Sequence, residues 1–122
     1  MHIMSNGSPP DNIILHQQSR TIELVYADNS YILTAEYLRV SSPSAEVQGH
    51  GPGQEILQIN KEKISITQLE PIGHYAIKIH FDDGHNSGLF TWDYLRDLSI
   101  EQVPRWQHYL DRLAKAGYHR KK

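Results

Sequence analysis

The chain carries eight histidines in 122 residues, and several of them lie near aspartates in the sequence. His74 and His80 are six residues apart on a predicted strand, so they are expected to share one face of it. His85 directly follows an acidic turn. Neutral imidazole and carboxylate are ligands that suit zinc or iron, so a metal site is one interpretation. The alternative is solvent-facing strand histidines and turn aspartates. The candidate metal ligands are His50, His74, His80, Asp82, Asp83 and His85.

Two other patterns could carry chemistry, and neither is specific. A serine–histidine–aspartate trio can be written from Ser44, His85 and Asp83, but almost any chain offers such a trio. The glycine-rich run at residues 49–53 lacks the Lys-Ser/Thr ending of a phosphate-binding loop. We therefore expect no catalytic residue, no bound cofactor other than iron or zinc, and no enzymatic activity.

Short strands and helices must position these residues. Alternating apolar residues predict strands, and the stripe Val103, Trp106, Leu110, Leu113 and Ala114 predicts an amphipathic C-terminal helix. The fold expected from this order is α+β, a small antiparallel sheet packed by helices as a two-layer sandwich. No internal repeat is visible. The predicted strands are 21–26, 31–34, 64–69, 75–81 and 87–90, and a short helix is predicted at 91–98.

Composition divides the chain into three parts. Residues 1–19 are rich in turn formers and are expected to be a flexible N-terminal segment, in which Ile13, Ile14 and Leu15 could pair at a sheet edge or pack loosely. Residues 20–117 form the predicted domain, including the C-terminal helix. Residues 118–122 are expected to be a solvated basic tail.

Charge and hydropathy exclude several classes of protein. Twelve Lys and Arg against fourteen Asp and Glu give a net charge of −2, which argues against a nucleic-acid binder. No apolar run approaches the length of about 20 residues that spans a bilayer, so no membrane association is expected. The chain has no cysteine, which excludes disulfides and thiolate metal sites. Without an export signal, a cytoplasmic location is the expectation.

Three segments in order resemble a known family. They are LRVSSPSAEVQGHGPG at residues 38–53, ITQLEPIGHYAI at 66–77 and DDGHNSGLFTWDYL at 82–95. Together they resemble the gamma-butyrobetaine hydroxylase-like N-terminal domain, in its stand-alone form of unknown function. In carnitine-synthesis dioxygenases, a similar domain precedes the catalytic domain, binds a structural zinc and helps dimerisation. The resemblance implies no hydroxylase activity here, because the iron site belongs to the other domain.

This chain departs from the zinc-binding motif of that family. The family pattern is Leu-Arg, two residues, Cys-Pro-Cys, two residues and Cys, with a histidine as the fourth ligand. Ser42, Ser44 and Val47 stand at the three cysteine positions, and His85 matches the histidine. Hydroxyls are poor zinc ligands and valine offers none, so hydrogen bonds are expected to replace the metal. Ser42 and Ser44 are therefore expected to lie near His85.

The resemblance also indicates what the domain could do. Similar domains are appended to Mrp-type ATPases that carry iron–sulfur clusters, which implies iron–sulfur assembly proteins as partners. We expect a non-enzymatic binding or adaptor module that docks on a protein or forms a homodimer. The alternative is a histidine- and aspartate-based iron or zinc protein linked to iron–sulfur metabolism. The expected partner surface, which includes the altered zinc motif, comprises Ser42, Ser44, Val47, His85 and Trp92.

Overall fold

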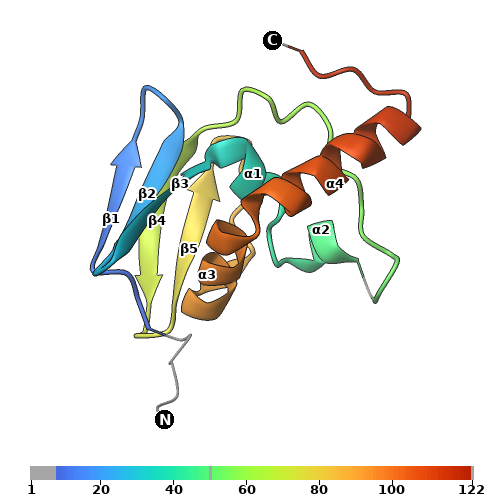
Figure 1. Ribbon diagram of the computed structural model, residues 1–122. Helices are drawn as coiled ribbons and strands as arrows, with labels where there is room; N and C mark the ends of the chain where they lie inside the picture. Colours follow the sequence, from blue (N-terminus) through green and yellow to red (C-terminus); the bar gives the residue numbers. More distant parts are fainter. Residues whose placement is uncertain (1–7, 50, 122) are drawn as a thin grey trace.

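The structure, a computed structural model, describes residues 8–49 and 51–121 (Figure 1). The strands stand on one side in Figure 1, and α3 and α4 stand on the other. In the described ranges, no helix has the length and apolar character needed to cross a membrane. In chain order the elements are β1 (Asn12–His16), β2 (Thr21–Tyr26), β3 (Asn29–Thr34), α1 (Ala35–Val40), α2 (Ala45–Gln48), β4 (Ile66–Ile72), β5 (Ala76–Phe81), β6 (Leu89–Thr91), α3 (Trp92–Ile100) and α4 (Gln102–Lys115).

The strands form two three-stranded antiparallel sheets, ordered β1-β2-β3 and β4-β5-β6. Each sheet is a meander in which neighbours in sequence pair directly. In the first sheet Tyr26 pairs with Asn29, so a two-residue turn joins β2 to β3. The predicted α+β class and the C-terminal helix are confirmed, and the strands divide between two small sheets.

The two halves of the domain repeat one architecture. Each meander runs directly into a helix, through the sequences Thr-Ala-Glu-Tyr-Leu-Arg and Thr-Trp-Asp-Tyr-Leu-Arg. Thr34 Oγ1 accepts the amide of Tyr37 at 3.0 Å, and Thr91 Oγ1 accepts the amide of Tyr94 at 3.2 Å. The threonine that ends each sheet therefore caps the helix that follows it. This repeat is too short to stand out in the sequence, and the matching topology makes it evident.

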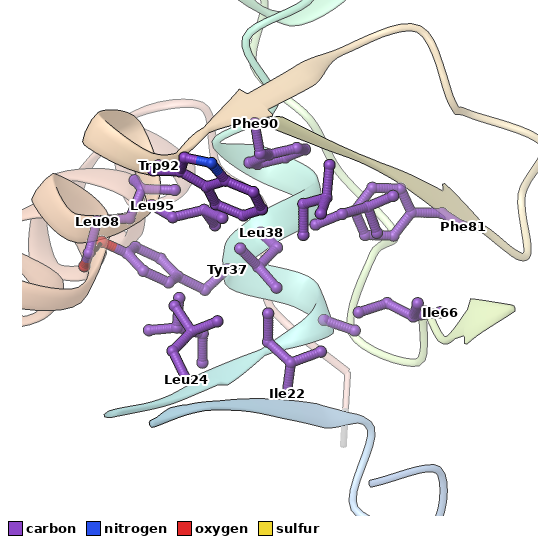
Figure 2. Close-up of a cluster of buried hydrophobic side chains, with 14 of the residues drawn as sticks. Ile22, Leu24, Tyr37, Leu38, Ile66, Phe81, Phe90, Trp92, Leu95 and Leu98 are labelled. Carbon is purple, nitrogen blue, oxygen red and sulfur yellow. Dashed lines mark hydrogen bonds between the residues drawn. The ribbon is translucent and has the colours of Figure 1, made fainter. Parts of the chain in front are cut away.

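Helix α1 lies at the centre of the core. Leu38 is fully buried, and in Figure 2 the side chains of both sheets and of α3 surround it. Full burial of such a leucine stabilises the fold by roughly 1.5–3 kcal/mol. The surrounding buried side chains include Ile22, Leu24, Ile66, Phe81, Phe90, Trp92, Leu95 and Leu98.

The ends of the chain differ from the sequence-based expectation. Residues 12–16, assigned above to a flexible segment, form the edge strand β1, in which Ile13 pairs with Leu24. The C-terminal residues, assigned to a solvated tail, fold back on the domain. Arg120 pairs with the buried Glu36, and the Tyr118 hydroxyl donates to a Glu62 carboxylate oxygen at 2.6 Å. Tertiary pairing, which composition does not encode, explains both differences.

The buried stripe of α4 also differs from the predicted one. Tyr109 and Leu113 are the buried residues of this helix, whereas Val103 is 80% exposed. Ala114 is exposed as well. The helix packs on the domain through its C-terminal half, where the Tyr109 hydroxyl donates to the Gln58 carbonyl at 2.6 Å. Its first turn therefore projects an apolar side chain into solvent.

Candidate functional site

The structure joins the α1–α2 loop to the β5–β6 turn through His85. His85 is 7% exposed. Its Nε2 lies 2.8 Å from the Ser42 hydroxyl oxygen and 3.3 Å from that of Ser44. Its Nδ1 lies 2.8 Å from a carboxylate oxygen of Glu46. The expected proximity of His85 to both serines is therefore observed.

The partners of His85 determine where its protons are. The carboxylate of Glu46 can only accept, so Nδ1 carries the hydrogen, and Nε2 of a neutral ring accepts from the Ser42 hydroxyl. Burial lowers the pKa of His85, and the nearby Arg39 lowers it further, against the opposing charge of Glu46. A neutral imidazole that links two loops is the state that this geometry favours.

Asp83 organises the charges beside His85. Its Oδ2 accepts from Arg39 Nε at 2.9 Å and from Lys61 Nζ at 2.6 Å, and its Oδ1 accepts the amide of His85 at 3.0 Å. Burial alone would raise the pKa of Asp83, but these hydrogen bonds outweigh it and lower the pKa to about 2. Asp83 is therefore an anion at neutral pH and neutralises the buried Arg39.

The hydrogen-bonded side chains of Ser42, His85 and Glu46 have the pattern of a nucleophile, a base and an orienting carboxylate. Ser42, however, is 0% exposed. Gly88 lies so close that a Cβ at that position would stand 2.5 Å from the Ser42 hydroxyl oxygen. The hydroxyl is covered and is not placed to attack a substrate. The trio written from sequence does not form either, because Asp83 bonds the His85 amide and not its ring.

The donor set at this site does not fit zinc. It consists of one imidazole nitrogen, whose ring is already held by Glu46, and the two hydroxyls of Ser42 and Ser44. Val47, at the remaining family ligand position, is 3% exposed and contributes only apolar contacts. Tetrahedral zinc takes thiolate, imidazole or carboxylate ligands, and hydroxyls do not replace them. The hydrogen bonds of His85 therefore make the loop-to-turn connection.

The other predicted metal ligands have separate partners. His80 Nε2 lies 2.9 Å from a Glu70 carboxylate oxygen, and Asp82 accepts the Ser65 amide at 3.1 Å. His74 is exposed in the turn before β5, and not on the strand with His80 as predicted. His50 lies outside the described residues. Within the described ranges, no group of three or more His, Cys, Asp or Glu could hold a metal ion.

Trp92, predicted to lie on a partner surface, is a core residue. It is 9% exposed, and its indole N–H donates to the His74 carbonyl at 2.8 Å. Its place in the first turn of α3 points it into the core (Figure 2). The structure adds Glu46 and Arg39 to the site. Arg39 belongs to the Leu-Arg motif, which could have indicated it, whereas nothing local in the sequence predicts the pairing of Glu46 with His85.

Comparison with known proteins is consistent with this fold. The family described as gamma-butyrobetaine hydroxylase-like, N-terminal, matches residues 13–96. One NMR solution structure is 51% identical, with a TM-score of 0.82 over 93% of this chain and 90% of that chain. A second NMR solution structure is 40% identical, with a TM-score of 0.79 over 98% of this chain and 90% of the other.

A crystal structure from Acidithiobacillus ferrooxidans, described as a protein of unknown function of the DUF971 family, is also similar. It is 39% identical, with a TM-score of 0.65 over 80% of this chain and 100% of that chain. A search of curated proteins finds no match. The match over residues 13–96 shows that the chain belongs to the gamma-butyrobetaine hydroxylase-like N-terminal domain family.

Proposed function

We propose that this domain is a non-enzymatic adaptor that docks on a partner protein through the corner between α3 and α4. The observation that carries the proposal is the exposure of two apolar side chains there. Ile100 is 61% exposed and Val103 is 80% exposed. Contiguous exposed apolar surface marks protein interaction sites, whereas single scattered apolar side chains do not.

The surroundings of this corner support docking. A cavity of about 400 Å³ lies beside Val103, and the half-buried Trp106 lines it together with Tyr37. Tryptophan and tyrosine are enriched among the residues that dominate binding energy at interfaces. An apolar side chain of a partner could enter this cavity while Val103 is covered.

The His85 region supports the same proposal in another way. The polar side chains of Ser42, Ser44 and Glu46 all bond His85, so they hold the α1–α2 loop in place. Ser42 and Ser44 are also buried. These residues act as a structural link in the proposed adaptor, and the docking contacts come from the α3–α4 corner.

The experiment compares partner capture by three forms of the protein. Val103→Glu should abolish capture of a specific partner, identified by mass spectrometry and then confirmed with the purified partner. Ile59→Glu, at a side chain that is 43% exposed in the loop before β4, is the matched control and should leave capture unchanged. Equal capture by both variants would reject the proposal that the partner docks at the α3–α4 corner. Iron–sulfur assembly proteins, implied by the family resemblance, are the first purified candidates.

Native mass spectrometry and elemental analysis of untagged protein test the remaining alternatives. A dimer that Val103→Glu dissociates would make a second copy the partner. One zinc or iron per chain, lost on His85→Ala, would replace the adaptor proposal with metal binding. A metal-free chain that captures its partner is the expected result.

A further inference from the structure

A second hollow lies along another face of α4 and shares Tyr37 with the cavity beside Val103. Its volume is about 580 Å³, within the range of roughly 300–1,000 Å³ typical of small-molecule sites. Residues of all four helices line it. Its apolar and aromatic lining is made by Tyr37, Val40, Val47, Tyr94, Pro104 and Tyr109.

The aromatic walls of this groove are fixed in position. Each of its three tyrosines donates its hydroxyl to a backbone carbonyl of a different segment, at 2.6–2.8 Å. The hydroxyls are therefore satisfied and the rings are held in place, with Tyr37 and Tyr109 buried and Tyr94 half-buried. A preformed wall lowers the entropy lost when a ligand binds. The three pairs are Tyr37 with Leu98, Tyr94 with Ser41 and Tyr109 with Gln58.

One face of α4 brings two guanidinium groups to the groove, which Glu55 and Glu101 also line. Arg105, His108 and Arg112 follow one another at helical spacing, and all three line it. Arg105 Nε donates to Glu101 at 2.8 Å. Arg112 forms no ion pair within residues 8–49 and 51–121, and its Nη2 donates only to the Glu55 carbonyl, at 3.2 Å. A guanidinium has five N–H donors, so Arg112 keeps several for an anion.

We propose that this groove binds a small organic anion, with its carboxylate or phosphate on Arg112 and its apolar body along Val40, Tyr94 and Pro104. Guanidinium pairs with both head groups through two parallel hydrogen bonds, so the shared chemistry is a planar or tetrahedral oxyanion. Val40 and Tyr94 are half-buried and Pro104 is exposed, so the apolar body would cover surface that is now in contact with water. This site does not rest on the proposed protein docking at Val103.

The test is an NMR titration of the nitrogen-15-labelled protein. Octanoate, octyl phosphate and octylammonium are each added in separate experiments, and the amide signals are followed. Saturable shifts of the groove amides are expected with an anion and not with octylammonium, and the tighter of the two anions identifies the head group. Arg112→Gln should raise the dissociation constant at least about tenfold, since a charge-assisted hydrogen bond contributes about 1.5–3 kcal/mol. Glu101→Gln should lower it by freeing Arg105.

Lys115→Gln, which removes the same charge from α4 outside the groove, is the control and should leave the dissociation constant unchanged. Arg112→Lys keeps the positive charge but lacks the two parallel N–H donors of a guanidinium, so it should bind the anion with intermediate strength. This variant tests the site if the NMR spectrum of Arg112→Gln shows that the protein is unfolded. Equal weakening by Arg112→Gln and Lys115→Gln, or equal shifts with octylammonium, would overturn the proposal. So would the absence of saturable shifts with both anions.

Discussion

Tyr37 and Tyr94 exchange hydrogen bonds between the two halves of the domain. The Tyr37 hydroxyl donates to the carbonyl of Leu98 at 2.8 Å, and the Tyr94 hydroxyl donates to that of Ser41 at 2.6 Å. Each accepting carbonyl lies four residues after the other tyrosine. The two Thr-capped helices therefore lock each other, which gives the repeated architecture a structural role at the base of the groove.

The first prediction concerns this lock. Tyr37→Phe leaves the Leu98 carbonyl without its donor in a buried place, so it should lower the free energy of unfolding by about 1–3 kcal/mol. Tyr94 is only half-buried, and Tyr94→Phe should cost less. Urea denaturation followed by circular dichroism measures both. A loss under 0.5 kcal/mol for Tyr37→Phe, roughly the lower limit for one hydrogen bond, would contradict the lock.

Tyr26 supplies the matched control for that measurement. Its buried hydroxyl has no hydrogen-bond partner among the described residues, so Tyr26→Phe removes a group that contributes no bond. The free energy of unfolding should stay the same or rise slightly, because an unsatisfied buried hydroxyl costs stability. The same denaturation series should separate the three Tyr→Phe variants by their hydrogen bonds alone.

The second prediction concerns the pH dependence of the His85 link. The pKa of folded His85 lies below its usual 6.5, so the unfolded chain binds more protons than the folded one between these two values. The contribution of His85 is therefore complete above about pH 6.5 and is lost as the pH falls toward the lowered pKa. Thermal denaturation of wild type and His85→Gln at several pH values measures it. Parallel pH profiles of the two proteins would contradict the prediction.

The third prediction concerns Asp83 and the buried Arg39. Asp83→Asn removes the carboxylate from a guanidinium that is 8% exposed, so it should cost about 3 kcal/mol. Lys61→Gln removes the less buried partner of the same carboxylate and should cost under about 1 kcal/mol. Because the pKa of Asp83 is lowered to about 2, its contribution is complete above pH 3.8 and disappears as the pH falls through 2. Acid denaturation of wild type and Asp83→Asn tests this.

Local patterns in the sequence predicted the strands from β2 onward but not β1, and tertiary pairing decided their limits. Alternation over residues 75–81 predicted a strand with Tyr75 on the buried face. The strand begins at Ala76, and Tyr75 is 54% exposed, because the turn extends to the residue before the sheet pairing starts. The sequence predicted Thr34 at the end of a strand and Thr91 at the start of a helix, and both are N-cap residues in the structure. Their equivalence emerges only when both halves are seen to share one topology.

The candidate site was predictable as far as the family motif reached. That motif placed Ser42 and Ser44 near His85, as the structure does. It could not place Glu46 on Nδ1, since that contact depends on how α2 is oriented over the turn. Sequence neighbours that shared a predicted metal site were separated for the same reason. His80 on β5 contacts Glu70 on the neighbouring strand β4. The spacing of residues along one strand does not reveal this register between strands.

The fourth prediction concerns the closure over Ser42. Gly88→Ala would place a methyl group 2.5 Å from the Ser42 hydroxyl oxygen and 2.9 Å from a ring carbon of Pro43. The loop must shift, so the free energy of unfolding should fall by about 1–3 kcal/mol and the His85 link should weaken. Gly51→Ala is the control, because a Cβ there meets nothing within 4 Å. Equal stability of the two variants would show that the loop adapts freely.

The last prediction concerns the C-terminal residues. Arg120 Nε lies 3.2 Å from a carboxylate oxygen of Glu36, and the guanidinium carbon lies 5.3 Å from the centre of the Trp106 ring. Glu36 is only 8% exposed, so Arg120→Gln leaves a buried carboxylate unpaired and should cost about 1–3 kcal/mol. Lys115→Gln is the control, because it removes an equal charge at an exposed residue.

A double-mutant cycle distinguishes this pairing from a general effect of charge. Glu36→Gln combined with Arg120→Gln removes both partners, so the double variant should be more stable than the sum of the single losses predicts. Strict additivity would mean that Arg120 and Glu36 do not interact in solution and that the C-terminal residues are the solvated tail that composition alone predicts. A coupling free energy of about 1 kcal/mol or more would instead make them part of the folded domain, and would place Arg120 over Trp106 at the edge of the proposed docking corner.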